Sequence, residues 1–201
     1  MAEPLANTFI YLMGVAGTGK LTVAKAIAAQ TGARVVDNQL INNPVFSVLR
    51  QDGVTPLPRG VWDRVFAIRA AVLETIATLS PPDWSFVFTH EAYGAAYDIA
   101  VYQLAREAAQ ARKAAFLPVR LVCDPDEIAR RVVNPERRIL MKSANAEKSR
   151  ARAAANATYD PGTPDVLTLD NTSLSPESAA DAIIRAAREL GGARAGPKAA
   201  R

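Results

Sequence analysis

The feature of this sequence that most constrains its fold is a glycine-rich loop, Gly14-x-x-x-x-Gly19-Lys20, near the start of the chain. An apolar run at 8–13 leads into the loop, and an amphipathic helix is predicted directly after it at 20–30. Glycine gives such a loop backbone conformations that are closed to other residues, so its amides can approach a bound anion closely. These amides, the positive end of the following helix and the Lys20 ammonium group together favour phosphate oxygens.

The spacing of this loop matches the Walker A motif, in which the lysine reaches the β- and γ-phosphates. A Gly-x4-Gly-Lys string occurs by chance in about one chain of this length in twenty, and the flanking strand and helix make coincidence rarer. The alternative is a glycine turn in an unrelated Rossmann-like fold, but the dinucleotide spacing Gly-x-Gly-x-x-Gly is absent. We therefore predict a nucleoside triphosphate site. Its predicted loop and helix residues are Gly14, Ala16, Gly17, Thr18, Gly19, Lys20, Leu21 and Thr22.

The rest of the chain reads as an alternation of strands and helices. Short apolar runs lie at 8–13, 33–37, 85–89, 116–123 and 165–170. Helical patterns lie at 20–30, 61–79, 94–113 and 176–190. Continuous apolarity is typical of strands that are buried on both faces of a parallel sheet. With right-handed crossovers, this order predicts a three-layer α/β/α fold around a doubly wound, five-stranded parallel sheet.

Length and composition limit the possible classes of protein. The 201 residues fit one domain, which we place at 1–192, and the basic end at 193–201 is expected to be a disordered tail. Cys123 is the only cysteine, which excludes an internal disulfide framework and a thiolate metal cluster. No stretch approaches the roughly 20 apolar residues that a membrane span requires, and the N-terminus lacks the basic start of a secretory signal. We expect a cytoplasmic protein with no membrane partner, either a monomer or a dimer.

The net charge of +4 raises the possibility of nucleic acid binding. The basic residues concentrate at 130–152 and 194–201, however, and no aromatic residues are interleaved among them there. A small anionic substrate explains the internal cluster better. A nucleic-acid-binding module remains an alternative, which a steep loss of affinity with rising salt would reveal.

The residues after the loop lysine resemble a known group of enzymes. Leu21 stands where most P-loop proteins have a serine or threonine that ligates Mg²⁺, and Thr22 comes one position later. Gly19-Lys20-Leu21-Thr22 is in this respect similar to the adenylate kinase and nucleoside monophosphate kinase group. The resemblance implies ATP as the phosphoryl donor, a threonine that contacts phosphate, and Mg²⁺ that is held largely through water.

Two carboxylates follow predicted strands. Small kinases similar to shikimate and gluconate kinase carry an aspartate where Asp37 stands, near the acceptor hydroxyl, and a carboxylate there can accept the proton or hold hydrated Mg²⁺. Asp37 can equally be a turn or helix-capping residue. Glu91 follows the third strand, where related folds place a Walker B acid, and is the other candidate base. Together with Thr22, both carboxylates are candidate Mg²⁺ ligands through water, whereas His90, the only histidine, is expected to make a structural hydrogen bond.

Two segments, 40–60 and 130–152, fit the core pattern poorly. Both follow strands and should emerge at the carboxyl edge of the sheet, where α/β proteins bind ligands. We interpret 40–60 as an acceptor-side flap and 130–152 as a mobile lid. On the helix after the flap, the resemblance to shikimate kinase would make either Arg64 or Arg69 a substrate ligand. Their residue type alone favours surface positions for both.

The position and basic composition of the lid resemble those of nucleoside monophosphate and shikimate-type kinases. That resemblance implies that Arg130 or Arg131 contacts adenine and that Arg137 or Arg138 reaches the transferred phosphoryl group. Arginines in this place would neutralise transition-state charge and exclude water. The alternative is a solvated helix with neighbouring glutamates as partners.

The loop after the last strand, Asn171-Thr172-Ser173, borders adenine in the same families, so Thr172 joins the candidate nucleotide contacts. The sequence Asp-Gly-Phe-Pro-Arg, which nucleoside monophosphate kinases carry after the third strand, is missing here. We therefore predict an ATP- and Mg²⁺-dependent kinase with a small hydroxyl acceptor that is shikimate-, sugar acid- or antibiotic-like. A nucleoside monophosphate kinase is one alternative, and a nucleotide-dependent regulatory ATPase or switch is another.

Overall fold

The structure is a computed structural model that describes residues 4–50, 55–135, 137, 141–142 and 144–195. Five parallel strands form one sheet in the order β2-β3-β1-β4-β5. The strands are β1 (Thr8–Met13), β2 (Arg34–Val36), β3 (Phe86–His90), β4 (Ala115–Val122) and β5 (Leu167–Asp170). The helices are α1 (Lys20–Thr31), α2 (Asn38–Phe46), α3 (Val61–Thr78), α4 (Ala96–Ala111), α5 (Pro125–Val132), α7 (Ala146–Ala154) and α8 (Pro176–Ala195).

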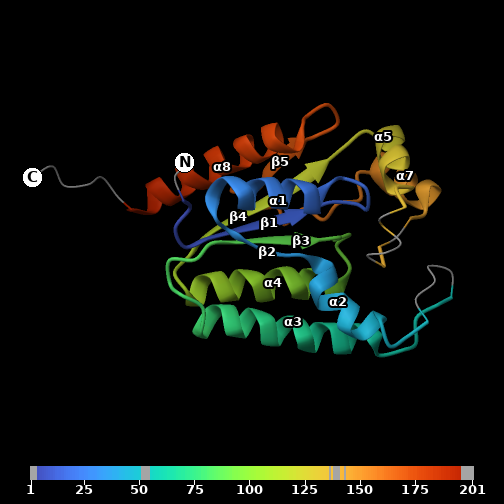
Figure 1. Ribbon diagram of the computed structural model, residues 1–201, viewed down its shortest axis with the longest axis horizontal. Helices are drawn as coiled ribbons and strands as arrows, with labels where there is room; N and C mark the ends of the chain where they lie inside the picture. Colours follow the sequence, from blue (N-terminus) through green and yellow to red (C-terminus); the bar gives the residue numbers. More distant parts are fainter. Residues whose placement is uncertain (1–3, 51–54, 136, 138–140, 143, 196–201) are drawn as a thin grey trace, which may run out of the picture.

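The sheet lies between two layers of helices, as predicted. Figure 1 shows α1 and α8 together on one face and α3 and α4 on the other. The central strand β1 contributes to both cores because successive side chains point to opposite faces. Ile10 and Leu12 pack in the core beneath α1 and α8, whereas Phe9, Tyr11 and Met13 pack in the core beneath α3 and α4. All six residues of β1 are buried, which explains its continuous apolar run.

The main departure from the expected elements is α2. It begins at Asn38 and extends to Phe46, into segment 40–60 that we interpreted as an acceptor-side flap, although Pro44 lies inside the helix. Proline removes a backbone donor and disfavours a helix interior. Here tertiary packing overrides that preference, because Ile41 and Phe46 are buried against Val61 and Val65 of α3. Residues 51–54 of the same segment lie outside the described residues.

The far end of the chain departs in a smaller way. Helix α8 continues to Ala195, so the first three residues of the segment 193–201, expected to be disordered, are helical. Residues 196–201 lie outside the described residues. No helix in the described part of the chain is both long enough and apolar enough to cross a membrane.

The register of the sheet brings several sequence-predicted residues to one edge. Met13, the last residue of β1, pairs with His90 of β3, and Val36 of β2 pairs with Phe88. The loop after β1, Asp37 and Glu91 therefore leave the sheet at neighbouring positions along its carboxyl edge, where α/β folds bind ligands.

Candidate active site

The glycine-rich loop is closed around its own lysine. A Cβ atom on Gly14 would lie only 2.9 Å from the Leu121 backbone oxygen, so a larger residue does not fit there. Gly19 has a φ of 82°, in the left-handed region that favours glycine. The Lys20 ammonium group donates hydrogen bonds to the Gly14 oxygen at 2.8 Å and the Val15 oxygen at 2.9 Å. The loop thus has the compact shape that a phosphate cradle requires.

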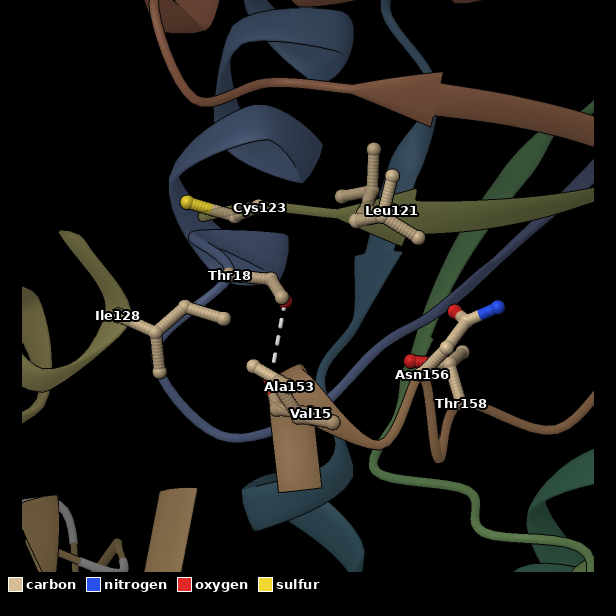
Figure 2. A pocket seen from close by; sticks show the side chains of 9 residues that line it. Val15, Thr18, Leu121, Cys123, Ile128, Ala153, Asn156 and Thr158 are labelled. Carbon is tan, nitrogen blue, oxygen red and sulfur yellow. Dashed lines mark hydrogen bonds between the residues drawn. The ribbon is translucent and has the colours of Figure 1, made fainter. Parts of the chain in front are cut away.

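The back of the loop is packed and hydrogen-bonded. The buried Thr18 hydroxyl donates to the Val15 oxygen at 3.0 Å, and the Asn171 amide donates to the Thr18 oxygen at 2.7 Å. Figure 2 shows the cavity behind the loop, with Cys123 and Ile128 in its wall. Its volume of about 20 Å³ has room for about one water molecule. This cavity is therefore too small to hold a nucleotide.

Lys20 lies among several charged groups. Burial lowers its pKa to about 8. The negative charges of Glu91 and Asp37 act in the opposite direction, whereas the positive charges of Arg137 and Lys142 lower the pKa further. Each of these groups therefore lies near enough to the ammonium group for its charge to be felt. Lys20, Asp37 and Glu91 come after the ends of three neighbouring strands, β1, β2 and β3, and basic residues of the predicted lid pair with both carboxylates.

Asp37 stands at the N-cap position of α2 without capping it through its side chain. One carboxylate oxygen accepts a hydrogen bond from the Thr89 hydroxyl at 2.5 Å, and the other lies 3.2 Å from the Lys142 ammonium nitrogen. The backbone N–H of Asn38 instead donates to the Thr89 hydroxyl oxygen at 2.9 Å. The carboxylate is thus directed toward basic groups of the site, and not toward the helix backbone.

Glu91 is held by an aromatic and a basic neighbour. One of its oxygens accepts a hydrogen bond from the Tyr93 hydroxyl and lies 3.3 Å from the Arg152 guanidinium nitrogen. The same guanidinium group lies 3.9 Å from the centre of the Tyr93 ring, within the range of a cation–π contact. Burial and Glu91 raise the pKa of Tyr93, so the phenol stays neutral and serves as a donor. Arg152 comes from α7 and joins the lid to the end of β3.

His90 has the structural role that we expected. Its Nδ1 lies 2.9 Å from the Tyr11 hydroxyl, and its Nε2 lies 3.6 Å from an oxygen of Asp98. Burial, together with the charges of Arg69 and Lys20, holds the pKa of His90 well below its usual value, so the ring is neutral. Asp98 also accepts a hydrogen bond from the backbone N–H of Tyr93. This bond holds the loop after β3, which carries Glu91.

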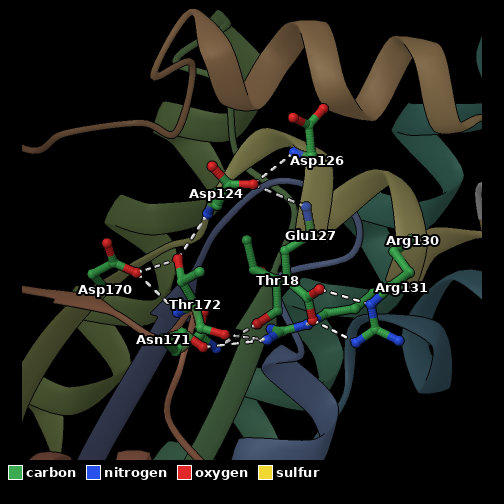
Figure 3. Close-up of polar contacts among 9 residues, drawn as sticks. All are labelled: Thr18, Asp124, Asp126, Glu127, Arg130, Arg131, Asp170, Asn171 and Thr172. Atoms are coloured by element: carbon green, nitrogen blue, oxygen red, sulfur yellow. Dashed lines mark hydrogen bonds and ion pairs between the residues drawn. The ribbon is translucent and has the colours of Figure 1, made fainter.

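The two arginines proposed for adenine differ in their surroundings (Figure 3). Both bind Glu127, and these hydrogen bonds lower the pKa of that carboxyl to about 2. The Arg130 side chain is 73% exposed, whereas that of Arg131 is 24% exposed. Arg131 also donates to the backbone oxygen of Thr172 at 2.9 Å and to that of Asn171 at 3.4 Å. Only Arg131 is thus joined to the loop that we expected beside adenine.

Other sequence-predicted residues lie in less decisive places. Arg137 is half-buried. Burial lowers the pKa of Arg137, and the negative charge of Glu91 is the largest effect that raises it. Arg138 lies outside the described residues. Leu21 is partly buried, and Thr22 is exposed on α1.

Arg69 is buried, although its residue type favoured a position at the surface. Arg69 is only 5% exposed, whereas Arg64 on the same helix is exposed. Arg69 donates to the amide oxygens of Asn38 at 2.6 Å and Asn42 at 3.4 Å, and its Nε has no hydrogen-bond partner. No carboxylate in the described part of the chain forms an ion pair with it.

The carboxylates fit Mg²⁺ held mainly by water and phosphate. Among the described residues, no three His, Cys, Asp or Glu side chains gather in a way that could enclose a metal ion. Mg²⁺ keeps several waters and is usually bound by one or two carboxylates plus substrate phosphates. Asp37 and Glu91, at the ends of neighbouring strands, suit that arrangement. Held there, the ion would neutralise negative charge on the phosphates.

Comparison with known proteins identifies the fold. No family model matches the sequence, and no curated protein matches it. A gluconokinase from Sinorhizobium meliloti 1021 aligns with a TM-score of 0.59 at 20% identity, over 93% of this chain and 97% of that one. Shikimate kinase from Acinetobacter baumannii in complex with shikimate aligns with a TM-score of 0.52 at 15% identity, over 95% of this chain and 96% of that one. Thymidylate kinase from Candida albicans aligns with a TM-score of 0.59 at 12% identity, over 92% of this chain and 93% of that one. The fold is that of the P-loop small-molecule kinases, as predicted.

Proposed function

We propose that this protein is a kinase that transfers the γ-phosphoryl group of ATP to a hydroxyl group of a small anionic acceptor. One observation carries the proposal. Basic residues of the predicted lid pair with both candidate carboxylates, Lys142 with Asp37 and Arg152 with Glu91, at the edge of the sheet where the loop of Lys20 lies. Phosphoryl transfer depends on positioning and on charges that stabilise the transition state, and this arrangement offers both.

In the proposed reaction, a bond forms between the acceptor oxygen and the γ-phosphorus while the bond from that phosphorus to the β,γ-bridging oxygen breaks. ADP leaves with the bonding electrons, and the hydroxyl proton passes to a carboxylate. We assign that role to Asp37, because its neighbour Asn38 is hydrogen-bonded to the buried Arg69 on the side where we place the acceptor. Glu91 would instead orient waters of the Mg²⁺ ion, and Lys20 would follow the charge that develops on the phosphates.

Arg69 supports an acceptor that carries a negative group. The buried guanidinium group of Arg69 donates to neutral amide oxygens and forms no ion pair with a carboxylate in the described part of the chain, whereas buried charges normally require a counter-charge. Arg69 is joined to Asn38, the neighbour of Asp37. An anionic group on Arg69 would therefore place the rest of a small acceptor near the proposed base. Hydroxy acids combine a carboxylate with hydroxyl groups, and two kinases named for such acids, gluconokinase and shikimate kinase, share this fold.

A screen of ADP release tests this proposal. Mg²⁺ and ATP are held constant while hydroxy acids, neutral sugars, hydroxyl-bearing antibiotics and nucleoside monophosphates are added in turn. We expect hydroxy acids to stimulate turnover. Stimulation by neutral sugars alone would contradict an anionic acceptor, and preference for nucleoside monophosphates would favour the other class of kinase.

Arg69→Met then tests the acceptor contact, with Arg64→Met as the matched control on the same helix. We expect Arg69→Met to raise the KM for the acceptor at least about tenfold, as the loss of one charge-assisted hydrogen bond predicts. The KM for ATP should stay unchanged, and Arg64→Met should leave both values unchanged. An equal effect of the two substitutions would overturn the assignment of Arg69.

A further inference from the structure

We propose that Lys142 is a second lysine of the phosphate site, which pairs with Asp37 in the absence of triphosphate and binds the γ-phosphate when a triphosphate is present. This inference rests on the proposed donor site. Lys142 belongs neither to the glycine-rich loop nor to the lid arginines that we considered as nucleotide contacts.

The pair itself is enclosed. The Lys142 ammonium nitrogen lies 3.2 Å from one Asp37 oxygen, and the two side chains are only 16% and 11% exposed. A mostly buried ammonium group requires an anionic partner. In the described structure that partner is Asp37, which the proposed reaction needs as the proton acceptor.

Lys142 also lies close to the phosphate loop. Its charge is one of those that lower the pKa of Lys20, so both ammonium groups act on the same small region. Asp37 and Glu91 offset part of the repulsion between these two cations, and the phosphate groups of a triphosphate would offset more of it. A lysine carries a compact charge on a flexible four-carbon stem. Lys142 can therefore exchange a carboxylate for a phosphate by side-chain rotation alone.

The backbone around Lys142 is anchored on the acceptor side. Met141 has a φ of 51°, an uncommon backbone conformation for a residue with a side chain, and its carbonyl accepts a hydrogen bond from the Gln39 side chain at 3.0 Å. The Met141 side chain packs against the apolar cluster formed by α2 and α3. The Lys142 backbone N–H donates to the Arg137 oxygen at 2.8 Å. These contacts hold the backbone of Lys142 against α2, the helix that begins next to Asp37.

The pairing of Lys142 with Asp37 would set the sequence of steps in the proposed reaction. While Lys142 is paired with Asp37, one oxygen of the base is occupied. Transfer of the ammonium group to the γ-phosphate frees that oxygen for the acceptor hydroxyl. The base thus becomes accessible when the donor is in place.

Isothermal titration calorimetry of nucleotide binding tests the inference without an acceptor. The wild-type protein, Lys142→Met, Lys142→Arg and Lys148→Met are titrated with Mg²⁺ and either ADP or the non-hydrolysable analogue adenylyl imidodiphosphate. Lys148 is the matched control because its side chain is exposed on α7 of the same segment. Binding of ADP also reports whether each variant is folded.

We expect Lys142→Met to weaken binding of the triphosphate analogue about tenfold and to leave ADP binding within about twofold, because only the triphosphate carries the γ-phosphate. Lys142→Arg should restore most of the loss, and Lys148→Met should show none. Equal weakening of both nucleotides, or unchanged binding of the analogue, would overturn the role of Lys142. Failure of the kinase proposal would show itself differently, as the absence of acceptor-stimulated turnover in a wild-type protein that still binds the analogue.

Discussion

Lys20 is held by two backbone oxygens of its own loop before any phosphate is bound. Its enclosure has an electrostatic cost, because burial disfavours the charged form and lowers the pKa to about 8. A triphosphate would reverse that balance by surrounding the ammonium group with negative charge. The protonation state of Lys20 should therefore depend on whether nucleotide is bound.

This dependence predicts proton uptake when nucleotide binds. A lysine with a pKa of about 8 is mostly protonated at pH 7 and mostly neutral at pH 9, whereas the phosphate-bound lysine stays protonated at both. We expect uptake to rise from roughly 0.1 proton at pH 7 to nearly one at pH 9. Calorimetry in buffers with different ionisation enthalpies measures it. Lys148→Met serves as the control and should behave as the wild type. Proton uptake that does not rise between pH 7 and pH 9 would contradict the role given to Lys20.

The acceptor side shows why some site residues escape a sequence reading. Arg69 was expected at the surface because arginine usually lies there, yet it lies four and eight residues after Val65 and Val61, on the buried side of α3. That spacing was the available signal. The pair of Asp37 and Lys142 gives no such signal, because its members lie far apart in the sequence and meet only in the folded chain.

At the scale of elements, the strands were predictable because burial on both faces makes their sequences continuously apolar. The strand β1 lies exactly where its apolar run was found, and the others differ by a few residues at their ends. Helix α2 was not predicted, since its amphipathic pattern is short and contains Pro44. Helix α7 lies within a basic segment, and Ser149 is the only buried residue of this helix, so apolar periodicity could not reveal it.

Helices α5 and α7 pack together, and α5 lies against the glycine-rich loop. The ion pair of Arg150 and Asp126, at 2.5 Å, joins the two helices. From α5, Arg131 reaches the backbone of the loop after β5, whereas Arg130 faces solvent. The expectation that one of these two arginines contacts adenine thus becomes a proposal for Arg131. The helix supplies both arginines, but its orientation directs only one inward.

The two arginines form a matched pair of substitutions. We expect Arg131→Met to weaken ADP binding by about fivefold to tenfold, because it removes a planar cation that can stack on adenine and that orders the loop at 171–172. Arg130→Met should change ADP affinity by less than about twofold, as is usual for an exposed ion pair. Titration calorimetry with ADP measures both. A larger loss in Arg130→Met would show that the assignment of the adenine arginine is wrong.

At the scale of the whole molecule, parallel strand order brings the donor and acceptor residues to one edge of the sheet. The loop after β1 would hold the triphosphate, the ends of β2 and β3 present the two carboxylates, and α3 presents Arg69 on the acceptor side. Of the basic lid residues, Lys142 pairs with Asp37 and Arg152 pairs with Glu91. The fold therefore concentrates opposite charges where a phosphoryl group would pass.

The central claim is that the γ-phosphoryl group passes to a small anionic acceptor and not to water. The most direct measurement uses ATP labelled on its γ-phosphate, Mg²⁺ and the acceptor that stimulates ADP release, and compares the label recovered on the acceptor with that recovered as inorganic phosphate. We predict that most of the label appears on the acceptor and that Lys20→Ala abolishes the transfer while leaving the fold intact, as judged by circular dichroism. Label recovered only as inorganic phosphate, with or without acceptor, would contradict the kinase account and favour a regulatory ATPase.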